Sequence, residues 1–571
     1  MHVTFDLRFP ASQHANHART SPLFPHSRPS SCAVMFARFA TRTTSFSSSS
    51  LFLHASFPRR TQPFHRSFVA FYSSVNMSPT FTINSTAGPA SFPHFVGPFI
   101  NGDFQPTLSP SPATRALLNP CTEELLVDVN EAGPEDVDQA VKVAQAALKG
   151  PWKDFTGKKR RNVLLAIANT LETHIKDLTL LEAACGKPYE EARMDIEEAV
   201  ECFRHFAGFA DKLHGQSFAT EENLKSYTLR KPVGVCGLIT SFNYPLVLAA
   251  WKIAPALACG NTIILKPAPQ TPLSSLMLGE LIAKHTELPK GVFNVLPGGE
   301  AVGSAIVSHM GIQKCSFTGS GNVGRKVMAG ASSSNLKSIT LELGGKSPLI
   351  VFADADLEQA VEDVFGAIFS NMGQNCCAGS RLFLEKGIEV EFLKKLKARV
   401  EQVKIGNTLD PQYDFGTMVD RAQFERVMGF LERAKKEGKS ELLVGGRRFG
   451  SKGYFVEPTV YHNVAENSTL AVDEIFGPVL SVMKPFNTID EALERANATP
   501  YGLASGVWTK NLSKAERCIQ ELETGVTWVN TYNLCSSHLP FGGVKESGFG
   551  KDLGAASLDE YTTVKAVTIR V

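Results

Sequence analysis

The chain has 571 residues, of which 43% are apolar and 20% are charged, and its formal net charge is +2 at pH 7. This composition is typical of a globular protein with two or three domains, and the charge balance gives no support to a nucleic-acid partner. No apolar run reaches the roughly 18 uncharged residues that a membrane-spanning helix needs. The eleven cysteines follow no disulfide or zinc spacing, which favours a reducing compartment and no metal site.

Residues 1–76 differ in composition from the rest of the chain. They contain eight arginines, many serines and phenylalanines, no lysine and a single acidic residue, Asp6. Such a basic, acid-poor segment is typical of an organelle transit peptide, so we expect a protein of the mitochondrial matrix. A disordered extension is the alternative, and translation from Met77 would give a cytoplasmic protein without a presequence.

The first part of the globular region is predicted to be mainly helical. An Asn-Gly turn divides a short strand in residues 95–103. Apolar residues at three- and four-residue spacing then indicate helices at residues 134–148, 158–186 and 195–213. Residues 226–231 are predicted to form a short strand outside the main sheet.

From residue 233 onward, strands and helices alternate. The run at 233–240 is continuously apolar, as expected for a parallel strand that helices cover on both faces. Further strands are expected at 261–267, 291–299, 311–317 and 338–345, with helices at 251–258 and 272–285. This alternation predicts an α/β fold with a doubly wound, Rossmann-like parallel sheet, whose ligands bind at the carboxyl ends of the strands.

The same alternation starts again beyond residue 347. We expect a strand at 348–352, a helix at 357–371, a long charged helix at 420–438 and a strand at 454–461. These elements and the segments after them predict a second α/β domain.

The stretch at residues 371–381 reads NMGQNCCAGSR and contains two adjacent thiols, Cys376 and Cys377. Neighbouring cysteines lack the Cα separation that an unstrained disulfide needs. A thiol on a turn of small residues can instead attack a substrate carbonyl. Taken alone, however, the pair is more typical of two ordinary buried cysteines.

A glycine-rich turn at residues 319–324 matches the dinucleotide fingerprint G-x-G-x-x-G between a predicted strand and a predicted helix. Such a turn brings a pyrophosphate close to a helix N-terminus, although a glycine turn without a ligand is the alternative. Glu342, about twenty residues further on, fits the acid that binds the ribose hydroxyl. A catalytic base is the second interpretation of Glu342.

Seven short motifs, in order and spacing, resemble the NAD(P)-dependent aldehyde dehydrogenase superfamily. They are Asn243-Tyr-Pro, Lys266-Pro, Phe317-Thr-Gly-Ser, Leu341-Glu-Leu-Gly-Gly-Lys-Ser-Pro, Gly373-Gln-Asn-Cys376, Glu474-Ile-Phe-Gly-Pro and Pro540-Phe-Gly-Gly. The resemblance runs from about residue 95 to residue 571. It implies a dinucleotide-binding domain at 82–212 and 233–344, a catalytic domain at 345–546, and a small β flap for oligomerisation at 213–232 and 560–571.

The resemblance implies the oxidation of an aldehyde to a carboxylic acid. Cys376 would be the nucleophile, Glu342 the general base rather than the ribose ligand, and the Asn243 side chain a donor to the oxyanion. The thiohemiacetal would lose a hydride to the nicotinamide, and water activated by Glu342 would hydrolyse the thioester that remains.

For the cofactor, the resemblance implies contacts to the adenosine ribose, the phosphates and the nicotinamide riboside. Lys266 is expected to contact the adenosine ribose. Gly319, Ser320 and Gly324 are expected to contact the phosphates, and Glu474 and Phe476 the nicotinamide riboside. Pro269 stands where many NAD-using members have a glutamate that repels a 2′-phosphate. We expect NAD as the cofactor, with NADP as an alternative.

The expected substrate is a small-molecule aldehyde. The resemblance implies a pocket lined by Tyr244, Leu248, Trp251, Cys535 and Phe541. Such an aromatic mouth suits an aliphatic or aromatic aldehyde, and it could also hold a trimethylammonium group by cation–π attraction. No arginine or lysine is expected there to receive a second carboxylate.

The resemblance further implies a homodimer or homotetramer, in which the β flap pairs between subunits. Two alternatives to aldehyde oxidation are a CoA-acylating relative and a non-catalytic binding or structural member of the family. A CoA-acylating relative lacks the glutamate base, so Glu342 argues against it. The intact set of Cys376, Glu342 and Asn243 argues against a non-catalytic protein.

Overall fold

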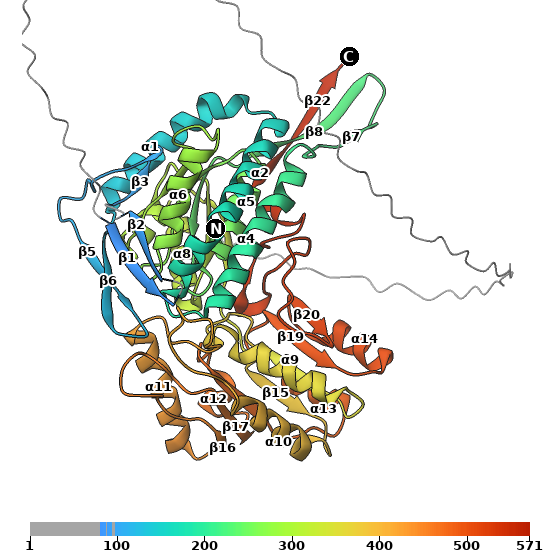
Figure 1. Cartoon of the computed structure of the whole chain (residues 1–571). Helices are drawn as coiled ribbons and strands as arrows, with labels where there is room; N and C mark the ends of the chain where they lie inside the picture. Colours follow the sequence, from blue (N-terminus) through green and yellow to red (C-terminus); the bar gives the residue numbers. More distant parts are fainter. Residues whose placement is uncertain (1–79, 87, 94–96) are drawn as a thin grey trace, which may run out of the picture. The chain divides into compact units, whose positions relative to one another are not determined.

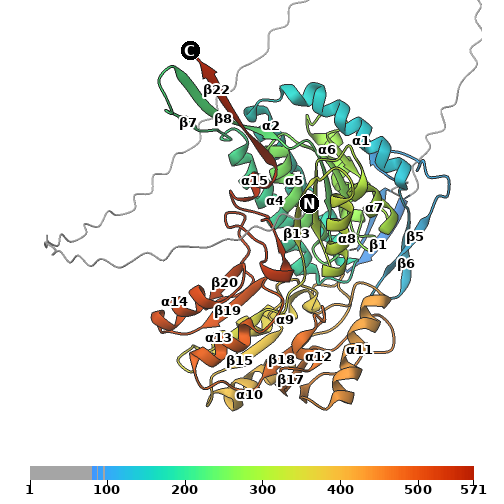
Figure 2. The same cartoon turned by 180° about the vertical axis from the view of Figure 1, so that it is seen from behind.

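The computed structural model describes residues 80–86, 88–93 and 97–571 (Figure 1). The expected targeting segment at residues 1–76 and the first residues of the strand predicted at 95–103 lie outside this part. The described residues belong to one compact unit that contains two large sheets, each with helices packed beside it (Figures 1 and 2). No helix among them is long and apolar enough to cross a membrane.

The first large sheet has eight strands in the order β21-β13-β12-β9-β10-β11-β3-β4. Its strands are β3 (Phe99–Ile100), β4 (Asp103–Phe104), β9 (Val235–Ile239), β10 (Thr262–Lys266), β11 (Phe293–Val295), β12 (Lys314–Thr318), β13 (Ser338–Glu342) and β21 (Gly548–Phe549). The five strands from β9 to β13 are parallel. The chain runs outward from β9 to β11 and then returns to the other side of β9 with β12. The Rossmann-like topology is therefore confirmed, with its switch point between β9 and β12, where such sheets bind ligands.

Apolar residues from both faces of this sheet enter separate cores. Val235 and Ile239 of β9 pack into one core, whereas Cys236 and Leu238 pack into the other. The continuous apolar run of this strand thus has the expected cause, burial on both sides. The face with Val235 and Ile239 is covered by α1 (Pro134–Lys149), α7 (Glu300–Ser308) and α8 (Gly321–Ser332). The face with Cys236 and Leu238 is covered by α2 (Gly157–Thr173), α3 (Ile175–Ala183), α4 (Tyr189–Ala210), α5 (Pro245–Ala258) and α6 (Leu273–His285). The 3₁₀ turn η1 (Pro151–Asp154) follows α1.

The second large sheet has seven strands in the order β16-β17-β18-β15-β14-β19-β20, all parallel except for the antiparallel pair of β16 and β17. Its strands are β14 (Pro348–Val351), β15 (Arg381–Leu384), β16 (Glu441–Val444), β17 (Thr459–Val464), β18 (Val479–Met483), β19 (Ala504–Trp508) and β20 (Val526–Val529). The helices of this half are α9 (Leu357–Phe369), α10 (Glu389–Val400), α11 (Arg421–Glu437), α12 (Thr469–Val472), α13 (Ile489–Asn497) and α14 (Leu512–Glu521).

Smaller sheets complete the fold. β1 (Thr80–Ser85) pairs with β2 (Gly88–Pro93), and β5 (Thr114–Asn119) pairs with β6 (Glu124–Asn130). A three-stranded sheet contains β7 (Ser217–Phe218), β8 (Leu224–Pro232) and β22 (Thr562–Arg570). β22 pairs with β8 within the chain, and both views show this sheet standing away from the helices (Figures 1 and 2). The 3₁₀ turn η3 (Lys545–Ser547) and the short helix α15 (Ser557–Glu560) lead to β22.

Four predicted element boundaries are wrong. The helix predicted at 158–186 is two helices, because His174 leaves the helical backbone between α2 and α3. The helix predicted from residue 195 starts at Tyr189 directly after Pro188, and the helix predicted from residue 251 starts with Pro245. Both prolines fix a backbone that opens a helix. The strand predicted at 454–461 begins only at Thr459, after Pro458, which has no amide to donate to a ladder.

A buried ion pair fastens the C-terminal segment to α5. Lys252 Nζ lies 2.7 Å from Asp552 Oδ2, and the two side chains are 1% and 6% exposed. The backbone of Asp552 exchanges two hydrogen bonds with Phe541. Phe541 in turn packs against Trp251 with its ring centroid 5.1 Å away. The ion pair therefore positions part of the expected substrate pocket.

We expect Asp552→Asn to destabilise the protein by about 3–5 kcal/mol, because it leaves the buried Lys252 ammonium without a counter-charge. The measurement is the shift of the urea unfolding midpoint. As a control, Glu521→Gln breaks the exposed pair with Arg517, whose side chains are 48% and 39% exposed. This control should cost less than about 1 kcal/mol, and equal shifts for the two variants would contradict a special role for the buried pair.

Candidate active site

The segment between α9 and β15 has a left-handed backbone before the two thiols. Within the 3₁₀ turn η2 (Ser370–Gly373), Asn371, Met372 and Gly373 have φ values of 48°, 53° and 68°. Such a backbone costs an ordinary L residue about 1–2 kcal/mol, so other contacts must hold it. Glu191 Oε2 of α4 accepts from Asn371 N at 2.7 Å, and Asn371 Nδ2 donates to Asn243 O at 2.8 Å. These bonds fix the loop to α4 and to the end of β9.

The two thiols of this loop have different surroundings. Cys377 is only 3% exposed. Its N–H and Sγ lie 3.2 and 3.3 Å from Asn375 Oδ1, and its carbonyl accepts from the Tyr532 hydroxyl at 2.8 Å. Cys376 is half-buried and lines a cavity. Of the adjacent pair, Cys376 is therefore the thiol that faces open space.

Glu342, the last residue of β13, lies beside this thiol. It is 4% exposed, and neither carboxylate oxygen has a hydrogen-bond partner among the described residues. Burial raises its pKa to about 8, although the neighbouring Cys376 thiol and the Lys252 ammonium oppose the shift. A carboxyl group with such a pKa can hold or accept a proton near neutral pH.

The Cys376 thiol is held in its protonated form. The adjacent Cys377 thiol, burial and the nearby Glu342 all raise the pKa of Cys376 well above its usual range. Because the thiolate is the nucleophilic form, attack by Cys376 requires a group that removes its proton. Glu342 is placed to be that group.

The cavity in front of Cys376 has a volume of about 560 Å³. It lies where the carboxyl ends of β9, β12 and β13 meet the thiol loop, the first turns of α11 and the segment after α12. Its lining residues are Ser241, Phe242, Asn243, Thr318, Gly319, Ser320, Glu342, Leu343, Gly344, Cys376, Gln423, Arg426, Glu474 and Phe476. The predicted residues Asn243, Glu342 and Cys376 thus meet in one place with four of the predicted cofactor residues.

Polar atoms without partners gather at this edge of the sheet. Thr240 Oγ1, Asn243 Oδ1 and Thr318 Oγ1 are buried and accept or donate no hydrogen bond among the described residues. Buried polar groups are rarely left unpaired, so these atoms are suited to a polar ligand. The N-terminus of α8 also opens here, and its N-cap residue Ser320 makes no side-chain cap. Free amides at a helix N-terminus favour a phosphate, which fits a dinucleotide.

Two predicted cofactor residues lie outside the cavity lining. Lys266 ends β10, and its buried ammonium donates to Pro267 O at 3.2 Å. Gly324 packs α8 onto the chain after β13, since a Cβ there would lie 2.8 Å from Leu343 Cδ2. In a dinucleotide fingerprint, the third glycine has this packing role. On the cavity wall, Glu474 Oε1 accepts from Gly345 N at 3.1 Å.

The predicted substrate residues begin near the thiols and continue along α5. Tyr244, Leu248 and Trp251 share one face of α5, and Trp251 packs against Phe541. Burial and then nearby acids, which include Cys377 and Cys376, raise the pKa of Tyr244, so its phenol lies close to both thiols. The structure therefore places Tyr244 near the thiols and Trp251 beside Phe541, but none of the predicted substrate residues lines the cavity in front of Cys376.

Sequence reasoning missed three residues that shape the site. Gln423 and Arg426 of α11 line the cavity, where they donate to the carbonyls of Phe476 and Glu474, both at 2.7 Å. Asn371 holds the thiol loop. Gln423 and Arg426 are three residues apart on a charged helix, a pattern that is more typical of a solvated surface. Only the fold shows that this helix faces the cavity.

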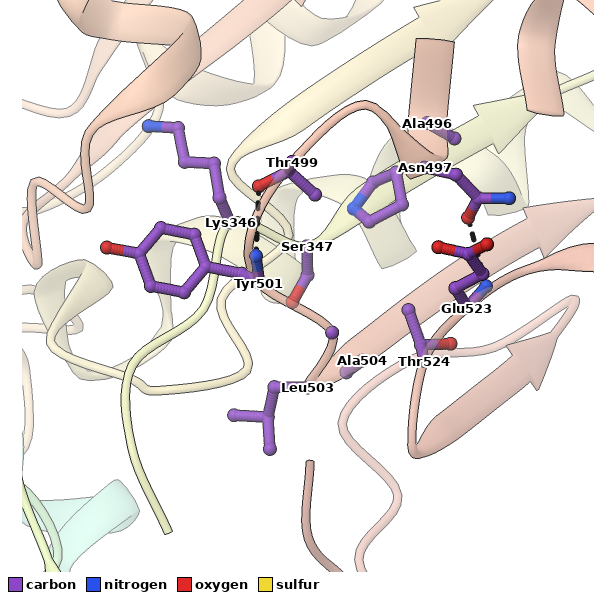
Figure 3. Close-up of a pocket in the computed structure, with 12 residues that line it drawn as sticks. Lys346, Ser347, Ala496, Asn497, Thr499, Tyr501, Leu503, Ala504, Glu523 and Thr524 are labelled. Carbon is purple, nitrogen blue, oxygen red and sulfur yellow. Dashed lines mark hydrogen bonds between the residues drawn. The ribbon is translucent and has the colours of Figure 1, made fainter. Parts of the chain in front are cut away.

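A second cavity, of about 200 Å³, lies beside the start of β14 and the segment before β19 (Figure 3). Lys346 and Ser347 line it together with Thr499 and Tyr501, and Tyr501 N donates to Thr499 Oγ1 at 3.3 Å. The cavity contains no thiol, so it is not the candidate active site. The described residues also contain no cluster of side chains suited to a metal ion.

A half-buried thiol, a buried unpaired carboxylate and a dinucleotide-type cavity define a class of enzyme that joins thiol chemistry to a nicotinamide cofactor. Comparison with known proteins identifies the family. The sequence profile described as the aldehyde dehydrogenase family matches residues 108–567. The chain therefore belongs to the aldehyde dehydrogenase family, whose members are NAD(P)-dependent oxidoreductases.

Individual relatives match most of the chain. A mitochondrial aldehyde dehydrogenase of Homo sapiens is 44% identical over 83% of this chain and 92% of its own length. A cytosolic aldehyde dehydrogenase of Mus musculus is 44% identical over 83% of this chain and 94% of its own length. The NAD⁺ complex of an aldehyde dehydrogenase from Bacillus cereus is similar in structure, with a TM-score of 0.81 and 42% identity over 83% of this chain and 96% of that chain.

Proposed function

We propose that this aldehyde dehydrogenase oxidises an aldehyde to its carboxylic acid through a covalent intermediate on Cys376. The observation that supports this most directly is the half-buried Cys376 thiol beside Glu342, a buried carboxyl group that no described residue hydrogen-bonds. The two groups meet at the carboxyl edge of a doubly wound sheet, where a dinucleotide fits. We assign the sheet of β9–β13 to the cofactor, and the thiol loop with the second sheet to catalysis.

In this proposal Cys376 loses its proton to Glu342 and attacks the carbonyl carbon. The Asn243 side-chain amide and the Cys376 backbone N–H would donate to the oxyanion that forms, each contributing about 3 kcal/mol as in comparable sites. When bound, NAD(P) supplies the hydride acceptor that turns the thiohemiacetal into a thioester. Glu342 passes the proton from Cys376 to solvent and becomes ionised again. It then takes a proton from water, whose oxygen attacks the thioester; the acid leaves, and the departing Cys376 sulfur regains a proton from Glu342.

The presence of Glu342 also distinguishes aldehyde oxidation from the two alternatives, a CoA-acylating enzyme and a non-catalytic protein. A CoA-acylating enzyme would pass the acyl group to a second thiol and would need no base for water. A non-catalytic protein would need neither Cys376 nor Glu342 in this arrangement. The test is to mix the protein with an aldehyde and NAD without CoA, and to measure NADH and acid together. Equal amounts of both are expected, whereas NADH formation that depends on CoA would contradict hydrolysis.

We propose NAD as the preferred cofactor, held in part by Lys266. Burial lowers the pKa of this ammonium to about 8, so it keeps most of its charge near neutral pH. The absence of a carboxylate at Pro269 leaves the site open to a 2′-phosphate. We therefore expect Pro269→Glu to weaken NADP binding at least about tenfold, with little change for NAD, because a carboxylate there repels the phosphate. Fluorescence titration with each cofactor measures this, and equal weakening of both would contradict the assignment.

We propose that the protein acts in the mitochondrial matrix, on the basis of the basic, acid-poor composition of residues 1–76. We also propose a homodimer or homotetramer. The exposed edge strand β22 carries the apolar side chains Val564 and Ile569, which are 62% and 43% exposed. Such an edge is suited to pairing with a second copy of the chain.

A further inference from the structure

Glu198 of α4 contacts Trp251, one of the aromatic residues expected to line the substrate pocket. Its Oε1 accepts a hydrogen bond from Trp251 Nε1 at 3.1 Å. No described residue donates to the second oxygen of this half-buried carboxylate, and none forms an ion pair with it. Trp251 packs its ring against Phe541, and both rings are buried. Beside these two rings, Glu198 therefore has a carboxylate oxygen that no described residue occupies and that can bind a donor or a cation.

The charges around Glu198 leave an excess of negative charge. Lys187 is the ammonium of this region, and it forms a buried ion pair with Asp195 while its Nζ lies 3.9 Å from the centroid of the Tyr244 ring. Two further carboxylates, Glu182 and Glu191, also surround it. Burial, followed by the neighbouring Asp195, raises the pKa of Glu198 to about 7. Within the part of the chain that the structure describes, four carboxyl groups thus share one ammonium, and Glu198 has no cation of its own.

The Cys376 thiol and Glu198 lie near opposite ends of the row formed by Tyr244, Leu248 and Trp251 along α5. Tyr244, near Cys376, and Trp251, near Glu198, are seven residues apart on α5, which corresponds to about 10 Å along the helix axis. Cys535 is half-buried and connects the two ends. Burial and then the charges of Cys377 and Glu198 raise the pKa of Cys535, so its thiol is near both groups.

We propose that Glu198 selects aldehydes that carry a cationic amine or trimethylammonium group a few bonds from the carbonyl. This inference rests on the proposed aldehyde oxidation. A chain of four bonds spans about 5 Å. With about 3 Å from the thiol to the carbonyl carbon and about 4 Å from the cation to the carboxylate, it bridges the two ends of the row. The faces of Trp251, Phe541 and Tyr244 would add cation–π attraction.

The test compares two aldehydes of equal shape, 4-trimethylammoniobutanal and 5,5-dimethylhexanal, which differ in charge. The assay runs with NAD at a pH near 9, where Glu198 is ionised given its pKa of about 7. The wild type should prefer the cation in kcat/KM by at least about tenfold. Glu198→Gln should lower that preference about 10- to 100-fold, mainly through KM for the cation, because glutamine can still accept from Trp251.

Glu197→Gln is the matched control, since Glu197 follows the same helix but points to solvent, where it pairs with Arg193. This variant should keep the wild-type preference, and Glu198→Asp should restore part of it. A wild type without preference for the cation, or a Glu198→Gln variant that slows both aldehydes equally, would overturn the proposal. Oxidation of the neutral aldehyde tests the proposed function separately, because it requires Cys376 and Glu342 but no cation site.

Discussion

Cys376→Ala should abolish aldehyde oxidation, whereas Cys377→Ala should retain most of it. The expected loss for Cys376→Ala is at least about 10⁴-fold in kcat, the scale seen when a covalent nucleophile is removed. The physical reason is the opposite placement of the two side chains. Cys376 lines the cavity, whereas Cys377 is buried against Asn375 and Tyr532. Only one thiol can therefore reach a carbonyl in front of Glu342.

Steady-state rates of NADH formation measure this difference, and mass spectrometry of the quenched enzyme should locate the acyl group on Cys376. The Cys377→Ala variant controls for the loss of a thiol from the loop as such. It should fall by no more than about tenfold, since it removes a buried packing atom and weak sulfur hydrogen bonds. An inactive Cys377→Ala beside an active Cys376→Ala would reverse the assignment.

Glu342→Gln should still allow acylation and hydride transfer, at a lower rate because Cys376 must then lose its proton to solvent, but it should stop turnover. Without a base for water the thioester accumulates, so rapid mixing should show one NADH per site followed by a steady state slower by about 10²- to 10⁴-fold. If Glu342 instead held the cofactor ribose, the variant would bind NAD weakly and regain its rate at high NAD. Recovery of normal steady-state turnover by cofactor alone would therefore contradict the base assignment.

The pH dependence of the deacylation rate is a second test of the role of Glu342. A general base acts in its ionised form, and burial raises the pKa of Glu342 to about 8. Below that pH most of the carboxyl groups are protonated, so the wild-type deacylation rate should fall about tenfold per unit as pH decreases. Above it the rate should level off. The residual deacylation of Glu342→Gln should lack this step, and an unchanged profile would assign the titration to another group.

The alternation of strands and helices predicted the Rossmann-like sheet because of a simple physical requirement. Parallel strands buried on both faces need apolar side chains at every position, as β9 has. Boundaries were less predictable, since the spacing of apolar residues continues through a break such as His174 and does not mark where Pro188 or Pro245 opens a helix. Tertiary contacts decide those ends.

For the site, the amino-acid sequence by itself determined the types of reacting group and their order along the chain. The motifs around Asn243, Glu342 and Cys376 are short contiguous stretches, so they can be recognised in the sequence without the structure. The family resemblance assigns the nucleophile to Cys376, and the tertiary structure supplies the physical reason, because the burial of Cys377 depends on Asn375 and on Tyr532, which lies 155 residues away. The tertiary structure also decided that Gln423 and Arg426 face the cavity and that Glu198 contacts Trp251, since each meets its partner only across packed helices and loops. Side chains that gain their role from such distant contacts have no local pattern to reveal them.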